Sequence, residues 1–314
     1  MLAEVVRSGT VEAVHDGVVV VVDRDRLVAV AGDVDRPFHL RSAAKPFQAT
    51  VALELGLDLP AEHLAVACGS HDADPIHVAM VLRMLADGGL SESDLRCPPA
   101  WPLGGPARRR ALARGHGGPR RVWHDCSGKH AAMVRVAAAR GWDVAGYRDP
   151  SHPVQTAVAG VLSDTMGGSF GPAGVDGCGV PVFPATATAM ARAFAALTTG
   201  RRFERVVEAM HRHPALVSGT GNLDTLVATW SGGVAKRGAE GCLGIAMPGG
   251  VGIAVKCWDG SDRPLGPVVM RVLEHLGLAH EGIRRGLEGI TAPPVLGGGA
   301  PVGAVRPLVR LHRP

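Results

Sequence analysis

Short apolar runs near both ends of the chain enclose a long helical stretch, and this order constrains the fold more than any other feature. Gly17 to Val22 and Leu27 to Ala31 are β-branched or apolar and are separated by four charged residues, so they predict two adjacent strands. A third run, Gly252 to Cys257, ends at a polar turn before a final helix that starts near Pro264. Strands at both ends with helices between them predict one interleaved α/β architecture.

Helical periodicity fills the sequence between these runs. Apolar residues recur at helical spacing in six segments, and Gly or Pro marks the segment ends. The expected helices are Ala43 to Leu55, Pro75 to Ala86, Gly128 to Arg140, Pro153 to Met166, Ala185 to Leu197 and Phe203 to His211. Cys97 to Pro106 and the terminal Thr291 to Pro314 predict a surface loop and a tail. No Ser/Pro-rich linker divides the chain, so residues 1–314 are expected to form a single domain.

Composition excludes several classes of protein. Of the 314 residues, 46% are hydrophobic and 20% are charged, which is typical of a globular chain. The run Gly17 to Val22 is too short to span a membrane and residues 1–17 lack the features of a signal peptide, so we expect a cytoplasmic protein with no membrane partner. Six scattered cysteines agree with a reducing compartment. A net charge of +4 with 4% aromatic residues argues against a nucleic-acid partner.

Lysine is scarce in this chain. Only Lys45, Lys129, Lys236 and Lys256 occur among 33 basic residues, so arginine carries the ordinary surface charge. A lysine can lose its proton and act as a base or a metal ligand, whereas the guanidinium of arginine cannot. Three of the four lysines lie in motifs that could use this property, and Lys236 is ambiguous.

A Ser-x-x-Lys motif, Ser42 with Lys45, lies where a helix is expected to begin. Helical spacing puts both side chains on one face, so a neutral lysine could take the serine proton and make the hydroxyl a nucleophile. Backbone N–H groups at the helix N-terminus add oxyanion donors. Taken alone, the commoner meaning of such a pair is a capping serine beside a solvated lysine.

A second serine and a second lysine are further candidates. Small neighbours around Ser70 suit close approach of a substrate, although a loop or capping serine is the plainer interpretation. Lys256 lies in the expected strand Gly252 to Cys257, where a buried lysine is costly unless it is paired or neutral. A strand lysine of this kind, in a chain that begins with Ser-x-x-Lys, resembles the layout of penicillin-recognising serine enzymes.

Two cysteines with neighbouring glycines indicate a metal site. Cys126 and Cys178 could supply two thiolates to a tetrahedral Zn²⁺, with His130 or Lys129 as the third ligand. The residues alone favour His130, because neutral amines are uncommon ligands. An alternative metal cluster comprises His71, Asp72, Asp74 and His77, although their spacing fits no known motif. The glycines of Pro248 to Gly252 do not complete a dinucleotide-binding fingerprint.

Taken together and in order, these motifs resemble the L-asparaginase II family of rhizobial type, from about residue 10 to residue 280. The segments that carry the resemblance are Ser42 to Pro46, Gly69 to His71, Asp125 to His130, Asp176 to Pro181, Gly219 to Thr225, Lys236 to Gly241 and Ile253 to Lys256. The family implies a fold similar to serine β-lactamases and glutaminases, with an antiparallel sheet flanked by helices and an added helical region.

The resemblance also implies roles for individual residues. It pairs Ser42 with Lys45 and Ser70 with Lys256 as catalytic groups. It implies a zinc ion held by Cys126, Lys129 and Cys178, which replaces the choice of His130. The supporting or substrate-binding positions are Arg41, Asp176, Asn222 and Asp224. At Asn222 the family usually carries arginine, which puts substrate preference or activity in doubt.

The implied activity is hydrolysis of L-asparagine to L-aspartate and ammonia through a serine acyl-enzyme, by a homodimer. One alternative is acyl transfer of the glutaminase or β-lactamase kind. A catalytically silent protein that binds an amino acid in the same pocket is the other. Asparagine binding without ammonia release would distinguish the silent protein from the enzymes.

Overall fold

The chain divides into two compact units, each assembled from separate stretches of sequence, in a computed structural model that describes residues 1–169 and 171–314. Unit 1 comprises Met1–Ala43, Ala185–Thr199 and Leu226–Pro314. Unit 2 comprises Ala44–Pro184 and Gly200–Thr225. The boundary between Ala43 and Ala44 falls inside the Ser-x-x-Lys motif, so Ser42 is described with unit 1 and Lys45 with unit 2.

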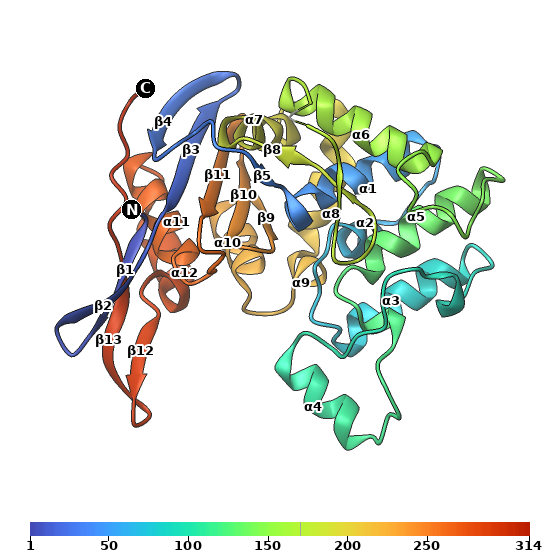
Figure 1. The fold of residues 1–314 in the computed structure, drawn as a ribbon, viewed down its shortest axis with the longest axis horizontal. Coiled ribbons are helices and arrows are strands. Elements are labelled where there is room, and N and C mark those ends of the chain that lie inside the picture. Colours follow the sequence, from blue (N-terminus) through green and yellow to red (C-terminus); the bar gives the residue numbers. More distant parts are fainter. Residues whose placement is uncertain (170) are drawn as a thin grey trace. The chain divides into compact units, whose positions relative to one another are not determined.

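A five-stranded antiparallel sheet forms the centre of unit 1, in the order β4-β3-β11-β10-β9 (Figure 1). Its strands are β3 (Gly17–Asp23), β4 (Arg26–Ala31), β9 (Val234–Gly238), β10 (Cys242–Met247) and β11 (Val251–Cys257). The three strands expected from the sequence, β3, β4 and β11, are confirmed. Helix α7 (Ala187–Leu197) packs on this sheet, and a Cβ at Gly252 would lie 2.0 Å from the carbonyl oxygen of Ala191. Glycine in β11 therefore allows the helix to approach the strand closely.

A second antiparallel sheet in unit 1 has the order β12-β13-β1-β2. Its strands are β1 (Ala3–Arg7), β2 (Thr10–His15), β12 (Pro294–Gly297) and β13 (Ala300–Pro307). The expectation that Thr291 to Pro314 is a surface tail is wrong, because most of that segment forms this hairpin. Gly298 and Gly299 adopt φ values of 57° and 86° at the turn, and a small core that includes Val5 and Val305 anchors the strands.

Helices make up most of unit 2. They are α1 (Lys45–Glu54), α2 (Ala61–Ala67), α3 (Pro75–Ala86), α4 (Gly105–Ala113), α5 (Ser127–Ala139), α6 (Pro153–Met166), α8 (Glu204–Arg212) and α9 (Pro214–Val217). A Cβ at Gly128 would lie 2.1 Å from the carbonyl oxygen of Val66, so glycine allows α5 to pack closely on α2. The six helices expected from the sequence, including α7 of unit 1, are confirmed within two residues at each end.

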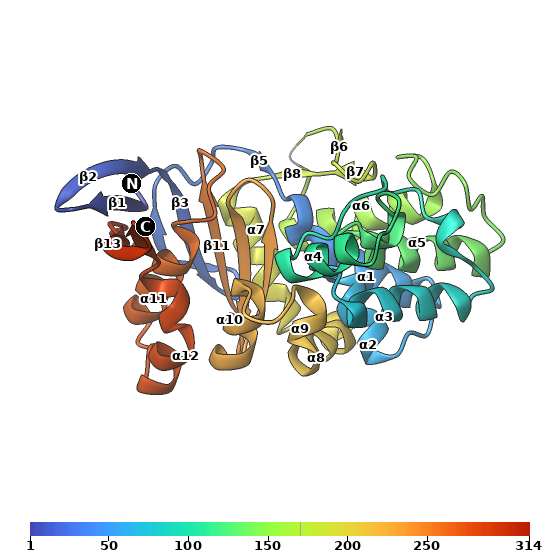
Figure 2. The ribbon, with the colours of Figure 1, turned by 90° about the horizontal axis from the view of Figure 1, so that it is seen from below.

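The remaining elements are short or peripheral. They are β5 (Phe38–His39), β6 (Gly174–Val175), β7 (Pro181–Val182), β8 (Pro184–Ala185), α10 (Leu223–Ser231), α11 (Leu265–His275), α12 (Glu281–Thr291) and four 3₁₀ turns, Arg41–Ala44, Glu92–Asp94, Arg121–Trp123 and Arg201–Phe203. Helices α11 and α12 pack side by side (Figure 2). All six cysteines are free and buried. Among the described residues, no helix combines the length and apolar character that a membrane crossing requires. The protein is thus a mixed α/β molecule with antiparallel sheets.

Candidate active site

Lys45 is the first residue of α1 and is fully buried. Its Nζ lies 2.8 Å from Ser70 Oγ and also donates to the carbonyl oxygen of Gly69. Both partners belong to the loop that follows α2. Unit 2 therefore places an amine in hydrogen-bond contact with a serine hydroxyl, which is the geometry that a lysine base needs.

Backbone contacts hold the loop that carries Ser70. The N–H of Ser70 donates to the carbonyl oxygen of Val217 at 2.8 Å, and the N–H of Asp72 donates to that of Ser218 at 3.0 Å. A Cβ at Gly69 would meet three carbonyl oxygens at 2.9–3.0 Å, so this position requires glycine. Ala73 follows with a φ of 58°, which is a strained backbone conformation of the kind that collects at functional sites.

His71 joins the Ser70 loop to α5. Its Nε2 lies 2.9 Å from Ser127 Oγ, which donates to the carbonyl oxygen of Val122, and its Nδ1 accepts from the N–H of Ala73. These contacts assign the proton to Nε2. Burial holds the pKa of His71 well below its usual range, so the ring is neutral and structural at neutral pH.

A carboxylate also lies near the amine of Lys45. Asp125 Oδ2 is 3.9 Å from Lys45 Nζ, and Asp125 Oδ1 is 3.0 Å from His124 Nδ1. Burial alone would raise the pKa of Asp125, but the hydrogen bond with His124 and the charge of Lys45 hold it well below its usual range. Burial likewise opposes protonation of His124, yet hydrogen bonds to Asp125 and Cys126 raise its pKa to about 9. Asp125 is therefore ionised and His124 protonated at neutral pH.

We expect Asp125→Asn to lower the free energy of unfolding by about 2 kcal/mol, because it leaves the buried Lys45 without its counter-charge. Because the pKa of Asp125 is lowered in the folded protein, its carboxylate stabilises the fold above about pH 4, and this stabilisation is lost as the pH falls. Because the pKa of His124 is raised in the folded protein, its imidazolium stabilises the fold below about pH 6.5. This stabilisation is lost as the pH rises through 9. The difference should therefore be largest between about pH 4 and pH 6.5.

Urea unfolding of chelator-stripped wild type and variant at about pH 3, 5.5 and 9.5 measures this effect. Asp58→Asn is the matched control, since its carboxylate is 89% exposed and pairs with the partly exposed Arg205; it should show no measurable change. A difference for Asp125→Asn that stays constant over these pH values would contradict the assignment.

Three of the expected metal ligands converge in unit 2. A hydrogen bond from the Cys126 thiol lowers the pKa of Cys178 to about 6, although burial opposes this, and the charge of Lys129 adds to the lowering. The same hydrogen bond, together with burial, raises the pKa of Cys126. Burial alone would lower the pKa of Lys129, but the sulfurs of Cys178 and Cys126 and the carboxylate of Asp176 raise it. Asp176 Oδ2 lies 3.6 Å from Lys129 Nζ.

This donor set fits a zinc ion. Two sulfurs and one amine in a buried cluster are donors that Zn²⁺ accepts, provided that Cys126 and Lys129 lose their protons on binding. His130 points elsewhere, because its Nδ1 lies 2.6 Å from the hydroxyl of Tyr147. Burial holds the pKa of His130 well below its usual range.

Ser42 and Lys256 are both buried in unit 1. Ser42 is buried in the 3₁₀ turn Arg41–Ala44, and Arg41 has a strained φ of 52°. Arg41 Nη1 lies 4.0 Å from Glu240 Oε1. Lys256 Nζ donates to the carbonyl oxygens of Glu240 and Cys257, the latter at 2.8 Å. Glu240, which the site prediction omitted although its motif was recognised, therefore contacts both cations.

The Gly219 to Thr225 segment supports the Ser70 loop. Asn222 Nδ2 donates to Asp72 Oδ2 at 3.0 Å, two residues after Ser70. An arginine at this position, as the family usually has, would face the same carboxylate with a full charge. Asp224 is buried in the first turn of α10.

The residues of the alternative metal cluster, His71, Asp72, Asp74 and His77, make hydrogen bonds and a ring contact instead of a grouping of metal ligands. His77 Nδ1 accepts from the N–H of Asp74 in a capping box at the start of α3, and its ring stacks on His71 at 5.1 Å between centroids. Among the described residues, the metal-capable groupings of His, Cys, Asp and Glu are His124, Asp125 and Cys126, and separately His15, Cys257 and Asp259.

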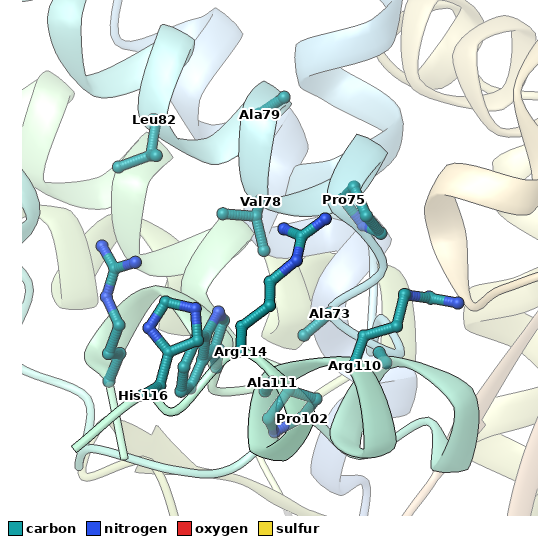
Figure 3. A pocket seen from close by; sticks show the side chains of 13 residues that line it. Ala73, Pro75, Val78, Ala79, Leu82, Pro102, Arg110, Ala111, Arg114 and His116 are labelled. Atoms are coloured by element: carbon teal, nitrogen blue, oxygen red, sulfur yellow. The ribbon is translucent and has the colours of Figure 1, made fainter. Parts of the chain in front are cut away.

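A cavity of about 340 Å³ in unit 2 lies between α3 and α4 (Figure 3). Apolar side chains such as Val78 and Leu82 line it together with Arg110, Arg114 and His116. In the described part of the chain, no predicted catalytic or zinc-binding residue lines this cavity. Its walls include Ala73 and Trp123, which flank the segments that carry Ser70 and Cys126.

Sequence reasoning missed Asp125 and His124 as partners of the site. Asp125 is the first residue of the recognised segment Asp125 to His130, so its position in the sequence was a signal that it belongs to the site. Its contact with Lys45 was not visible, because it depends on packing of α1 against the segment before α5.

An amine–serine contact beside a half-buried carboxylate and a thiol pair defines a hydrolase-like site in unit 2. The sequence model of the family described as L-asparaginase II matches residues 3–307, and the chain belongs to that family. No curated protein matches the sequence.

Distant likeness to solved structures was also found. A crystal structure of Mglu in its glutamate form shares 19% identity at a TM-score of 0.41, covering 85% of this chain and 63% of that one. A crystal structure of Mglu in its native form in the presence of 4.3 M NaCl shares 18% identity at a TM-score of 0.39, covering 84% of this chain and 61% of that one. The chain thus spans less than two thirds of these proteins, and the family assignment rests on the sequence model.

Proposed function

We propose that the protein is an L-asparaginase of rhizobial type that hydrolyses L-asparagine to L-aspartate and ammonia through a serine acyl-enzyme. Membership of the L-asparaginase II family supports an amidohydrolase. The observation that carries the proposal is the contact of the fully buried Lys45 Nζ with Ser70 Oγ at 2.8 Å, beside the ionised Asp125. The proposed fold is that of serine β-lactamases, with residues 1–314 as one domain.

The proposed chemistry uses two hydroxyls and two amines. Ser42 Oγ attacks the side-chain amide carbon of asparagine, and Lys45, once it has released the proton that pairs it with Asp125, accepts the hydroxyl proton. Ser70 with Lys256 passes a proton to the departing ammonia, and a water then hydrolyses the ester to release aspartate. Arg41, Asp176, Asn222 and Asp224 are proposed to position the substrate or to brace these groups.

Zinc is part of the proposal. Cys126, Lys129 and Cys178 would hold the ion, and it would supply a fixed positive charge that orients the α-carboxylate or α-amine end of the substrate or stabilises the site. The thiol hydrogen bond and the adjacent Lys129 support this ligand set. The proposed setting is a cytoplasmic homodimer, and light scattering of the purified protein would measure its mass.

Ammonia release from purified protein tests the activity. Asparagine should be turned over with zinc present, whereas glutamine and a cephalosporin should be turned over far more slowly. Preference for glutamine or the cephalosporin would instead support the acyl-transfer alternatives. Calorimetric binding of asparagine without ammonia release would support the silent binding protein.

We expect Ser42→Ala and Ser70→Ala each to lower kcat/KM at least a hundredfold while the melting temperature changes little, because each removes one hydroxyl from the proposed reaction. Ser231→Ala is the matched control, since its Oγ donates to the carbonyl oxygen of Val227 within α10; it should retain activity.

Mass spectrometry after reaction with an electrophilic asparagine analogue locates the nucleophile. Labelling is expected at Ser42 and should disappear in Ser42→Ala. Labelling at Ser70, with turnover lost only in Ser70→Ala, would exchange the roles of the two serines.

A further inference from the structure

Three side chains that can bind metals meet in unit 1, outside the residues assigned to catalysis or to zinc. His15 Nδ1 lies 2.6 Å from Asp259 Oδ2, and Cys257 Sγ lies 2.9 Å from Asp259 Oδ1. One potential ligand atom from each residue lies within 4.8 Å of the other two. The imidazole and the thiol therefore contact different oxygens of one carboxylate.

Strand register explains this convergence. In the antiparallel pair of β3 and β11, Gly17 lies opposite Cys257, and the N–H of Trp258 donates to the carbonyl oxygen of Asp16 at 2.8 Å. His15, the last residue of β2, and Asp259, in the turn after β11, each lie two residues beyond the Gly17–Cys257 pair. The backbone, rather than flexible side chains, thus brings the imidazole and the carboxylate together, which favours a preorganised site.

Burial and access suit a bound cation. The Cys257 thiol is fully buried and His15 is 6% exposed, whereas the carboxylate of Asp259 is 45% exposed and leaves a path from solvent. His15 Nε2 is buried and has no hydrogen-bond partner among the described residues. If a metal binds at Nδ1, the ring therefore loses only its hydrogen bond with Asp259. The proton of the neutral ring is then on Nε2.

We propose that His15, Cys257 and Asp259 form a metal site for a late first-row divalent cation such as Zn²⁺ or Co²⁺, separate from the Cys126, Lys129 and Cys178 cluster. Imidazole, thiolate and carboxylate are all ligands that these ions accept, and a water would complete a tetrahedron. Ligand distances of about 2.0–2.3 Å require donor atoms roughly 3.3–3.8 Å apart, so the two short contacts open slightly on binding. Cys257 releases its thiol proton to solvent as the metal binds.

The proposed site ties the end of β2 to the end of β11. It is independent of the proposed asparaginase activity, because none of its three residues has a role in that reaction. Occupancy would cross-link the ends of β2 and β11 beside Lys256, which precedes Cys257 in β11.

Co²⁺ is the probe, used on the chelator-stripped protein at about pH 7.5. Bound cobalt is counted by elemental analysis after gel filtration, and thiolate coordination is followed by its near-ultraviolet charge-transfer absorption. Asp259→Asn, His15→Gln and Cys257→Ser should each lower bound cobalt by one equivalent relative to wild type, or lower the affinity for that one cobalt ion at least tenfold. Cys257→Ser should also remove part of the absorption.

Cys242→Ser is the matched control, because Cys242 is a buried thiol of the same sheet that is absent from this cluster; its cobalt content should equal that of wild type. Because each variant is compared with wild type, the difference in bound cobalt does not depend on whether the Cys126, Lys129 and Cys178 cluster also binds cobalt. Asp259→Asn changes a partly exposed side chain, so it remains informative even where Cys257→Ser fails to fold. Equal cobalt content in wild type and Asp259→Asn would overturn the proposal.

Discussion

Lys45→Arg is expected to abolish ammonia release although the positive charge remains. A guanidinium does not lose its proton in a protein, so it cannot take the proton of a serine hydroxyl. A positioned base contributes about 10²–10⁴ in rate, and kcat should fall by at least the lower of these values. Steady-state ammonia release, measured with saturating asparagine, gives the comparison.

A matched control separates chemistry from packing, because Lys45 is fully buried and arginine is larger. Lys236 is also a fully buried lysine, and its Nζ donates to the carbonyl oxygen of Arg237. Lys236→Arg should therefore lose a similar amount of thermal stability while it retains turnover. A Lys45→Arg enzyme that melts cooperatively and keeps activity within about tenfold of wild type would remove Lys45 from the mechanism.

Local sequence patterns predicted much of the fold. The valine run of β3 is buried throughout, and its continuous apolar character made the strand recognisable. The helices α3 and α6 were predictable to the residue, because proline marks the first residue of each. The hairpin of β12 and β13 was not predictable, since its strands contain proline and glycine and are stabilised by pairing and packing with β1, which is distant in sequence.

The candidate site was predictable as a set of motifs but not as a set of contacts. Scarcity of lysine singled out Lys45, and the structure places this buried residue in contact with the half-buried Ser70 and Asp125. Neither the spacing of 25 residues to Ser70 nor that of 80 to Asp125 contains this information. Such contacts depend on how helices pack, which local periodicity does not encode.

The pair Cys126 and Cys178 illustrates the same limit. The residues are 52 positions apart, and only the neighbouring glycines and aspartates connected them in the sequence. The ligand between them was harder to choose. Lys129 and His130 are adjacent on α5, so helical geometry sends their side chains in directions about 100° apart, and only one can face the thiols. The structure directs Lys129 to the sulfurs and His130 to Tyr147.

Lys129→Arg is accordingly expected to remove most of the zinc from the purified protein, whereas His130→Ala retains it. A coordinated amine must be neutral, and arginine offers no neutral nitrogen at accessible pH. Cys126→Ser and Cys178→Ser should lower zinc content in the same way, and the zinc content of wild type should fall with pH as protons compete for the ligands. Elemental analysis of protein prepared without chelators measures all four variants.

His130→Ala needs a separate measure of folding, because the ring is fully buried and contacts the Tyr147 hydroxyl. Its removal should lower the free energy of unfolding by roughly 2–4 kcal/mol without reducing zinc content per folded molecule. Zinc lost in His130→Ala but kept in Lys129→Arg would make the imidazole the ligand. Wild-type protein with no stoichiometric zinc would leave Cys126 and Cys178 as a buried thiol pair, whose role is then packing, because free cysteine behaves as a small apolar side chain.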